Sequence, residues 1–152
     1  MKIKTIKVVN AYRALKDIKL SNASDDVLLS MWKNINALKP IADKYDNDLK
    51  LAEDTLKDDK FNKMQERARQ VQEQGNKRIE ELSSDERKNI DEINEFFLNH
   101  QNKLNKQVEA LSEVEVDIDV NYINEKDLLS ILIKDNSKTL NDMLNVDFLL
   151  KK

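Results

Sequence analysis

The sequence predicts a mainly α-helical fold. Long antiparallel, heptad-patterned helices form a helical hairpin or three-helix bundle, and the base holds a small two-stranded β-ribbon and short C-terminal helices. Three observations support this prediction. The 152 residues include one glycine and one proline, too few for the turns of an all-β fold. Residues 24–58 repeat their apolar side chains with heptad spacing. Residues 114–120 alternate apolar and acidic side chains, as an amphipathic strand does.

The N-terminal segment predicts a short strand followed by a helix. Residues 1–9 alternate lysine with isoleucine or threonine and then reach two valines, which indicates a strand with one polar face. Asn10 is a suitable N-cap for a helix of about ten residues. The apolar face of that helix carries Ala11, Leu15 and Ile18.

The stretch 24–58 predicts the first long helix, with Ser24 and the two acids after it forming a favourable N-terminus. Steps of three and four residues then connect Leu28, Met31, Ile35, Leu38, Ala42, Tyr45, Leu49, Ala52 and Leu56. Pro40 removes a backbone hydrogen bond but leaves this seam intact, so we expect a kink with a preserved apolar face. The sequence alone leaves open whether Pro40 kinks the helix or splits it.

Two more helical segments complete the predicted projection. The heptad frame breaks at residues 58–60 and restarts at Phe61, so we expect a turn and then a second helix, weakened at Gly75. Residues 83–86 have the pattern of a capping box and predict the start of a third helix. The seam of that helix consists of Ile90, Ile93, Phe97, His100, Leu104, Gln107 and Leu111.

The C-terminal part predicts the rest of the base. The acidic face of residues 114–120 complements the N-terminal lysines, so we predict that the two strands pair, with about 0.2–1 kcal/mol from each cross-strand charge pair. We expect Asn124 to cap a short segment whose apolar residues, within 128–133, leave no polar stripe and are therefore buried. A last helix or turn follows around residues 137–146, and residues 148–150 pack it down. We therefore expect a single domain, 1–152, with a base from 1–22 and 112–152 and a helical projection from 24–111.

The composition excludes several classes of function. The chain has no cysteine, which excludes disulfides, thiolate metal sites and cysteine nucleophiles. Its net charge of -3 lacks the excess of positive charge that nucleic-acid binders carry. The N-terminal segment lacks the apolar core and cleavage site of a signal peptide, and no apolar run approaches the roughly 20 residues that span a bilayer. We therefore expect a cytoplasmic protein with no membrane partner.

The sequence contains no recognisable catalytic, cofactor-binding or metal-binding motif, and we predict that the protein is not an enzyme. The only histidine, His100, lacks an HExxH or ExxH neighbour. The carboxylates are interleaved with lysine and arginine, a pattern typical of solvated helix faces. Gly75 alone cannot form a phosphate-binding loop.

Four residues are candidate partner contacts: Trp32, Tyr45, His100 and Gln107. Trp32 flanks the first seam, where it is either an interface hot spot or, as is commoner, packed at a helix crossing. His100 and Gln107 are polar residues in a helical seam, where such groups fix register or partner. Alternatively, these two residues mark where the seam opens to solvent.

Nucleic-acid association is the alternative function. Two basic patches would contact phosphates without reading sequence. One lies at the N-terminus (Lys2, Lys4, Lys7, Arg13, Lys16, Lys19) and the other on the second helix (Arg67, Arg69, Lys77, Arg78). Glutamates surround the second patch and the acidic strand faces the first, so salt-bridged, solvated faces are the better interpretation.

Two segments carry a family resemblance. The N-terminal strand followed by AYRAL at residues 11–15, and LNKQVEALSEVEVDIDV at residues 104–120, resemble small helical proteins of unknown function encoded by tailed phages and prophages. The resemblance implies a phage accessory or assembly protein in the host cytoplasm and no site residues. Our leading hypothesis is a non-enzymatic helical interaction protein that contacts another protein or itself, as a homo-oligomer.

Overall fold

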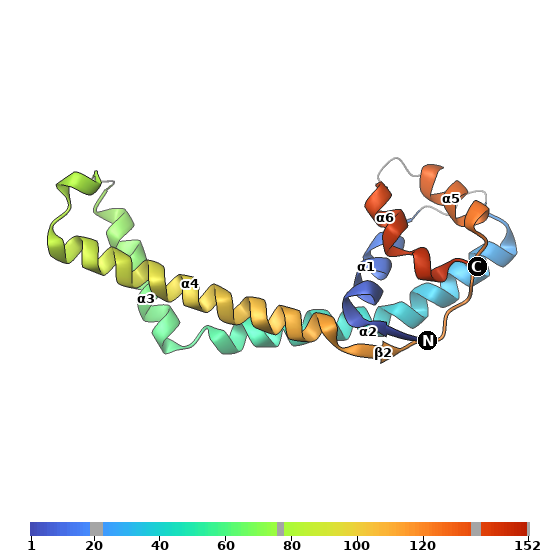
Figure 1. Cartoon of the computed structure of the whole chain (residues 1–152), viewed down its shortest axis with the longest axis horizontal. Helices are drawn as coiled ribbons and strands as arrows, with labels where there is room; N and C mark the ends of the chain where they lie inside the picture. Colours follow the sequence, from blue (N-terminus) through green and yellow to red (C-terminus); the bar gives the residue numbers. More distant parts are fainter. Residues whose placement is uncertain (19–22, 76–77, 135–137, 152) are drawn as a thin grey trace. The chain divides into compact units, whose positions relative to one another are not determined.

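The computed structural model describes residues 1–18, 23–75, 78–134 and 138–151 and is mainly helical, as predicted (Figure 1). The chain divides into two compact units. Unit 1 comprises Met1–Asn47 and Ala110–Lys152, and unit 2 comprises Asp48–Glu109. The boundary differs from the expected one, because residues 25–47 belong with the base and not with the projection. Their buried side chains, among them Met31 and Leu38, form part of the core of unit 1.

The two predicted strands pair, but both are short. β1 (Lys2–Lys4) is antiparallel to β2 (Glu115–Asp117), with Ile3 opposite Val116. The prediction that residues 5–9 continue the first strand is wrong, since α1 (Thr5–Leu15) begins directly after β1. The buried residues Thr5, Val8 and Val9 have helical spacing. The backbone N–H and the hydroxyl of Thr5 both donate to the carbonyl of Val114, each over 2.8 Å, which fixes the point where strand becomes helix.

The first long helix is continuous. α2 (Asp25–Leu56) contains Pro40 and is not split by it. None of its nine predicted seam residues is exposed, and Met31, Leu38, Ala42 and Tyr45 are buried. A proline removes one backbone hydrogen bond, and the apolar seam compensates because it runs on both sides of Pro40.

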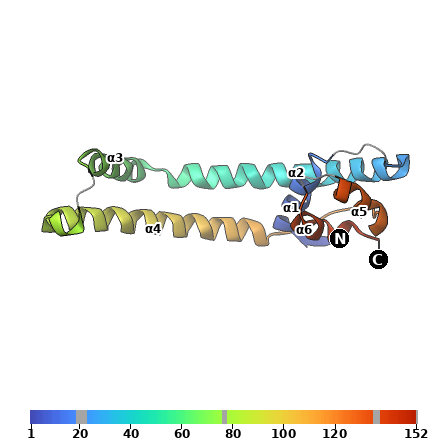
Figure 2. The same cartoon turned by 90° about the horizontal axis from the view of Figure 1, so that it is seen from above.

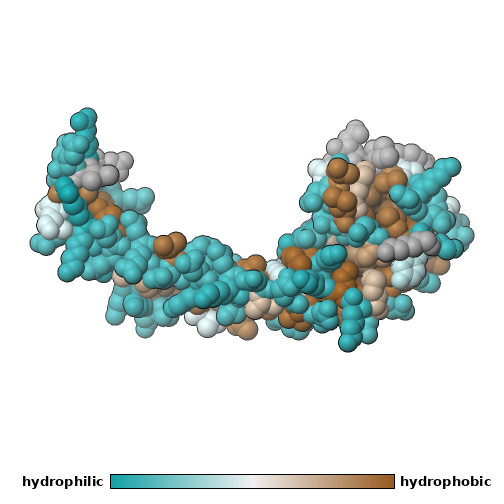
Figure 3. Space-filling view, viewed as in Figure 1, coloured by the Kyte–Doolittle hydropathy of each residue, from teal (hydrophilic) through white to brown (hydrophobic). Residues whose placement is uncertain are grey.

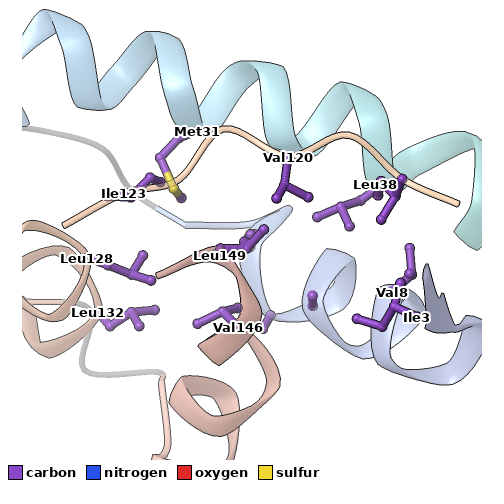
Figure 4. Close-up of a cluster of buried hydrophobic side chains, with 14 residues drawn as sticks. Ile3, Val8, Met31, Leu38, Val120, Ile123, Leu128, Leu132, Val146 and Leu149 are labelled. Carbon is purple, nitrogen blue, oxygen red and sulfur yellow. The ribbon is translucent and has the colours of Figure 1, made fainter. Parts of the chain in front are cut away.

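The core lies in unit 1, where both ends of the chain meet the first half of α2 (Figure 4). α5 (Glu125–Lys134), α6 (Leu140–Asn145) and a 3-10 turn, η2 (Asp147–Leu149), contribute its C-terminal part. Leu128, Ile131, Leu132 and Leu149 are buried as predicted, and each such side chain stabilises the fold by about 1.5–3 kcal/mol. The predicted burial of Ile133 and the predicted start of the last helix or turn around residue 137 lie outside the described residues.

Unit 2 follows the predicted order of elements. α3 (Asp59–Glu73) is followed by η1, a 3-10 turn (Ile79–Glu81), and by α4 (Ser84–Glu113), whose last residues belong to unit 1. Asp58 caps α3 by accepting the N–H of Phe61 at 2.8 Å. The predicted capping box before α4 is present, since Ser83 and Glu86 each accept the other's backbone N–H, at 3.2 and 2.7 Å.

A glycine follows α3, and α3 runs antiparallel to α4. Gly75 has a φ of 89° just after α3, a left-handed conformation that glycine adopts without a steric penalty. α3 lies alongside the first half of α4 (Figures 1 and 2). Phe61 contacts Phe97 while Arg67, further along α3, contacts the earlier residue Asn89, so the two helices are antiparallel.

At Gln107 the structure favours the second of the two predicted alternatives, in which the seam of α4 opens to solvent. Gln107 is exposed, and the neighbouring Val108 is half-buried in its place. A straight α-helix drifts by about 20° per heptad relative to a 3.5-residue repeat, so over several turns the apolar stripe moves to the adjacent position. In this chain the adjacent residue is a valine. None of the described helices is long and apolar enough to cross a bilayer.

Candidate functional site

Unit 2 has almost no core of its own. Among its described residues only Ile93 is buried, with 7% of its surface exposed. The other seam residues of α3 and α4, such as Phe61, Met64, Phe97 and Leu104, are half-buried. Two helices side by side cover one flank of each apolar stripe, whereas a helical bundle covers both. The open flanks make unit 2 the candidate interaction surface.

An aromatic cluster joins α3 to α4. Phe61 packs edge-on against Phe97, with ring centroids 5.6 Å apart, and lies 4.6 Å from the ring of His100. Phe96 packs edge-on against Phe97 at 5.5 Å, and the ammonium of Lys60 lies 5.7 Å from the centroid of the Phe96 ring. Such contacts add about 0.5–1.5 kcal/mol per aromatic pair beyond simple burial. This cluster connects α3 to α4 at the start of α3.

His100 also lines a hollow of about 230 Å³. Its lining contains a single carboxylate, that of Asp58, together with the lysines Lys60 and Lys103. A catalytic histidine is normally oriented by a carboxylate that accepts a hydrogen bond from its ring. Asp58 already accepts a backbone N–H as the N-cap of α3. The arrangement around His100 therefore supports helix packing better than catalysis.

Of the two candidate contacts in unit 1, one is exposed and the other is buried. Trp32 is 61% exposed on α2, one helical turn from the exposed Leu29, so the interpretation that it packs at a helix crossing is wrong. Tyr45 is buried, and its hydroxyl lies 3.2 Å from the hydroxyl oxygen of Ser112. Tyr45 therefore belongs to the core of unit 1, and its side chain is not available to a partner. The heptad seam that suggested Tyr45 as a contact is the same signal that predicts its burial.

The two candidate contacts in unit 2 also differ. His100 is half-buried and has a specific neighbour in Phe61, so it belongs to the seam as predicted. Gln107 is exposed and does not form a polar layer in that seam. His100 is thus a packing residue at the edge of the hollow, whereas Gln107 lies on an open face of α4.

Two arginines of the basic patch pair with acids of unit 2, whereas Arg78 lies beyond the end of α3. Arg67 donates to Asn89, at 3.1 Å from its Nε, and to Glu92, at 2.9 Å from its Nη2. Arg69 pairs with Glu66 at 2.9 Å and with Glu73 at 3.8 Å. The hydrogen bond from Arg69 lowers the pKa of Glu66, as expected for a carboxylate beside a guanidinium. The predicted salt-bridged face is confirmed for these residues, although Lys77 lies outside the described residues.

The N-terminal patch is only partly paired, and in a different way from the prediction. Lys4 pairs with Glu113, which precedes the acidic strand, and Arg13 pairs with Asp46 of α2 at 2.6 Å. The amino group of Met1 donates to the carboxylate of Asp117 over 2.8 Å and lowers the pKa of that carboxyl. Lys19 lies outside the described residues.

Asn34 of α2 is a fully buried polar residue that was not among the predicted site residues. Its Nδ2 donates to the carbonyl of Asn121 at 2.8 Å, and its Oδ1 accepts the N–H of Asn121 at 2.7 Å. These two bonds hold the extended chain after β2 against α2. The Asn34 side chain thus pairs with the backbone groups of Asn121, as a neighbouring strand would do in a sheet. The spacing contained the signal, because Asn34 lies three residues after Met31 and four before Leu38.

The outer face of α4 carries a continuous exposed stripe. It carries Arg87, Asp91, Asn94, Leu98, Gln101, Asn105 and Glu109, all exposed and three or four residues apart. Gln101 donates its amide to Asn105 at 2.9 Å. Leu98 is 61% exposed near the middle of this stripe. We call these seven residues the amide stripe.

The described residues contain no group of three His, Asp or Glu side chains placed to hold a metal ion. No protein-family model matches the chain, and neither a curated protein nor a solved structure shows significant similarity to it.

Proposed function

We propose that the protein is a non-enzymatic helical interaction protein that binds another protein chain through unit 2. The main support for this proposal is that Ile93 is the only buried residue among the described residues of that unit. A helical unit gains most of its stability by burying an apolar face. Unit 2 leaves the flanks of its own face open, and a partner helix would cover them.

The contrast between the two units supports this proposal. Unit 1 contains the whole cluster of buried side chains shown in Figure 4 and is closed by both chain ends. The visible face of unit 2 is mostly hydrophilic, with a few separate hydrophobic patches (Figure 3). A surface of this kind, polar with isolated apolar positions, is typical of non-obligate interfaces. Unit 1 would then serve as the anchor that fixes the ends of the helices.

The setting is part of the same proposal. The resemblance of residues 11–15 and 104–120 to phage-encoded helical proteins suggests an accessory or assembly protein that acts in the host cytoplasm. The salt-bridged state of Arg67 and Arg69 weighs against nucleic acid as the partner, because paired cations release fewer counterions on binding phosphate.

Affinity capture from cells that naturally produce this protein tests the proposal. The bait is the full chain, compared with a variant carrying Leu51→Lys and Leu98→Lys, two leucines of unit 2 that are 67% and 61% exposed. A matched control carries Leu29→Lys and Leu140→Lys, two exposed leucines of unit 1. Exposed substitutions change stability by about 0.5 kcal/mol or less, so all three proteins should fold.

We expect a protein, either a second copy or another chain, that is recovered with the wild type and the unit 1 control but lost with the unit 2 variant. A tagged and an untagged copy expressed together make self-association visible in the same experiment. The proposal fails if no protein is recovered whose binding depends on the unit 2 substitutions.

A further inference from the structure

The amide stripe of α4 has an internal symmetry. Arg87 and Glu109 each lie eleven residues from Leu98, on opposite sides of it. At 1.5 Å per residue each is about 16 Å from Leu98 along the helix axis. An antiparallel copy of α4 related by a two-fold axis at Leu98 would therefore place each Arg87 opposite a Glu109.

The residues between these ends fit the same arrangement. Around the axis at Leu98, Asp91 would face Asn105, Asn94 would face Asn102, and Glu95 would face Gln101. None of these pairs places like charges together, and amides can donate to carboxylates and to each other. Buried or half-buried amides on a helix face also fix register and orientation in helix pairs.

A parallel copy would be disfavoured by the same side chains. It would place Arg87 opposite Arg87, and would pair Asp91, Glu95 and Glu109 each with its own equivalent. Opposed like charges on neighbouring helices cost free energy, as they do within one helix. The charge pattern therefore distinguishes the two orientations.

Arg87 and Glu109 are available for such pairing. Both side chains are exposed, and neither has a salt bridge to another described residue. The stripe also borders the half-buried seam, because Phe97 lies three residues from Asn94 and four from Gln101. A helix along the stripe would cover the exposed flank of Phe97 as well as Leu98.

We propose that unit 2 binds a second copy of this chain through the amide stripe, with the two α4 helices antiparallel and the two-fold axis at Leu98. This inference rests on the interaction function proposed above and names its partner. The interface is isologous, so every pair occurs twice. Its specificity comes from the two Arg87–Glu109 pairs and its apolar contact from Leu98 and the edge of Phe97.

Charge reversal provides the first test, because the symmetry predicts an unusual pattern. Arg87→Glu alone places two pairs of carboxylates in contact, and Glu109→Arg alone places two pairs of guanidinium groups in contact. Each variant should dimerise about tenfold or more weakly than the wild type. An equimolar mixture should restore association, because the heterodimer has opposite charges at both ends. Sedimentation velocity of the full-length proteins over a concentration series measures all four cases.

Lys63→Glu is the matched control for net charge. Lys63 is exposed on α3, outside the amide stripe, and its reversal changes the net charge as Arg87→Glu does. We expect this control to dimerise like the wild type. The antiparallel arrangement is overturned if the control weakens the dimer equally, or if the mixture of the two single variants remains as weak as each alone.

Cysteine cross-linking provides the second test, since the chain has no cysteine of its own. Leu98→Cys places two thiols at the proposed two-fold axis, so oxidation should convert most of the protein to a covalent dimer. Leu51→Cys introduces an equally exposed thiol elsewhere in unit 2 and should cross-link far less. Equal cross-linking of the two variants, or a wild type that is monomeric at every concentration, overturns the proposal. A different protein whose capture still depends on Leu51 and Leu98 would leave the interaction function in place.

Discussion

Replacing Asn34 with alanine is expected to destabilise unit 1 strongly, although Asn34 is a polar residue in an otherwise apolar seam. Its amide makes two hydrogen bonds, of 2.8 and 2.7 Å, to the backbone of Asn121. Alanine removes the side-chain donor and the side-chain acceptor at once. The carbonyl and the N–H of Asn121 would then lie against α2 without a hydrogen bond.

The magnitude follows from the burial of these groups. An unsatisfied buried polar group costs about 1–3 kcal/mol. Asn121 is half-buried, so water can reach part of it, and the lower part of that range applies to each of its two groups. We therefore expect a loss of about 2–3 kcal/mol, a large share of the 5–15 kcal/mol that stabilises a typical domain. The midpoint of thermal unfolding should fall by about 5–10 °C.

Thermal and urea unfolding followed by circular dichroism measure the loss, and hydrogen exchange of the Asn121 amide reports the bond directly. Asn36→Ala is the matched control, since Asn36 is exposed on the same helix. Its substitution should leave both measurements nearly unchanged. Equal stability of the two variants, within about 0.5 kcal/mol, would refute the argument that the Asn34 amide holds the extended chain.

Asn34→Asp adds a dependence on pH that alanine lacks. A neutral carboxyl can donate to the Asn121 carbonyl and accept its N–H, whereas a carboxylate can only accept. Burial and the facing carbonyl both raise the pKa of this carboxyl in the folded state. The folded state then binds more protons than the unfolded state between about pH 4 and the raised pKa, so stability falls as the pH rises through that window. A variant whose midpoint follows the wild type across this window would contradict the prediction.

Two further substitutions test other contacts. His100→Leu keeps the packing against Phe61 and removes a half-buried polar ring, so its thermal midpoint should equal or exceed that of the wild type, and a clear fall would reveal a polar partner of His100. Asp142 has a pKa lowered by hydrogen bonds from the N–H and hydroxyl of Thr139, so its charge stabilises the fold above about pH 4 and the benefit is lost as the pH falls through the lowered pKa. The difference in midpoint between the wild type and Asp142→Asn should therefore be larger at pH 7 than at pH 2.5, and a constant difference would contradict the capping role of the charge.

The local patterns of the sequence predict the long helices well. The seam from Leu28 to Leu56 appears in the local spacing of apolar residues, and the capping box at residues 83–86 joins residues three apart. The structure confirms both. The pairing of β1 with β2 was also predictable. The lysines of the first segment and the acids of the second mark the two as complementary strands, although the predicted strands were too long.

The errors concern places where a distant part of the chain decides the structure. Residues 5–9 have a β-type alternation, yet the carbonyl of Val114 fixes Thr5 as the start of a helix. Asn34 lies on the buried face of α2 because the extended chain around Asn121 needs a hydrogen-bonding partner there. Neither partner can be identified from the local sequence, since each is separated from the residue it binds by most of the chain.

The candidate interaction surface was predictable in kind but not in position. Of the four candidate contacts, Trp32 is exposed, whereas Tyr45 is part of the core. A heptad pattern marks which residues share a helix face and does not show whether that face meets the same chain or a partner. The exposed stripe around Leu98 could not be recognised until the structure showed which side of α4 faces α3.

The uneven distribution of buried side chains determines how the interaction proposals can be tested. The buried cluster of unit 1 provides most of the apolar burial in the described residues, whereas unit 2 contributes Ile93. Substitutions at exposed positions of unit 2, such as Arg87 and Glu109, should therefore change association with little effect on folding. Substitutions in unit 1, such as Asn34→Ala, should destabilise the fold itself, so any loss of association there would be indirect. A variant that stays folded and loses association therefore identifies a contact residue, and the charge-reversed pair is expected to behave in this way.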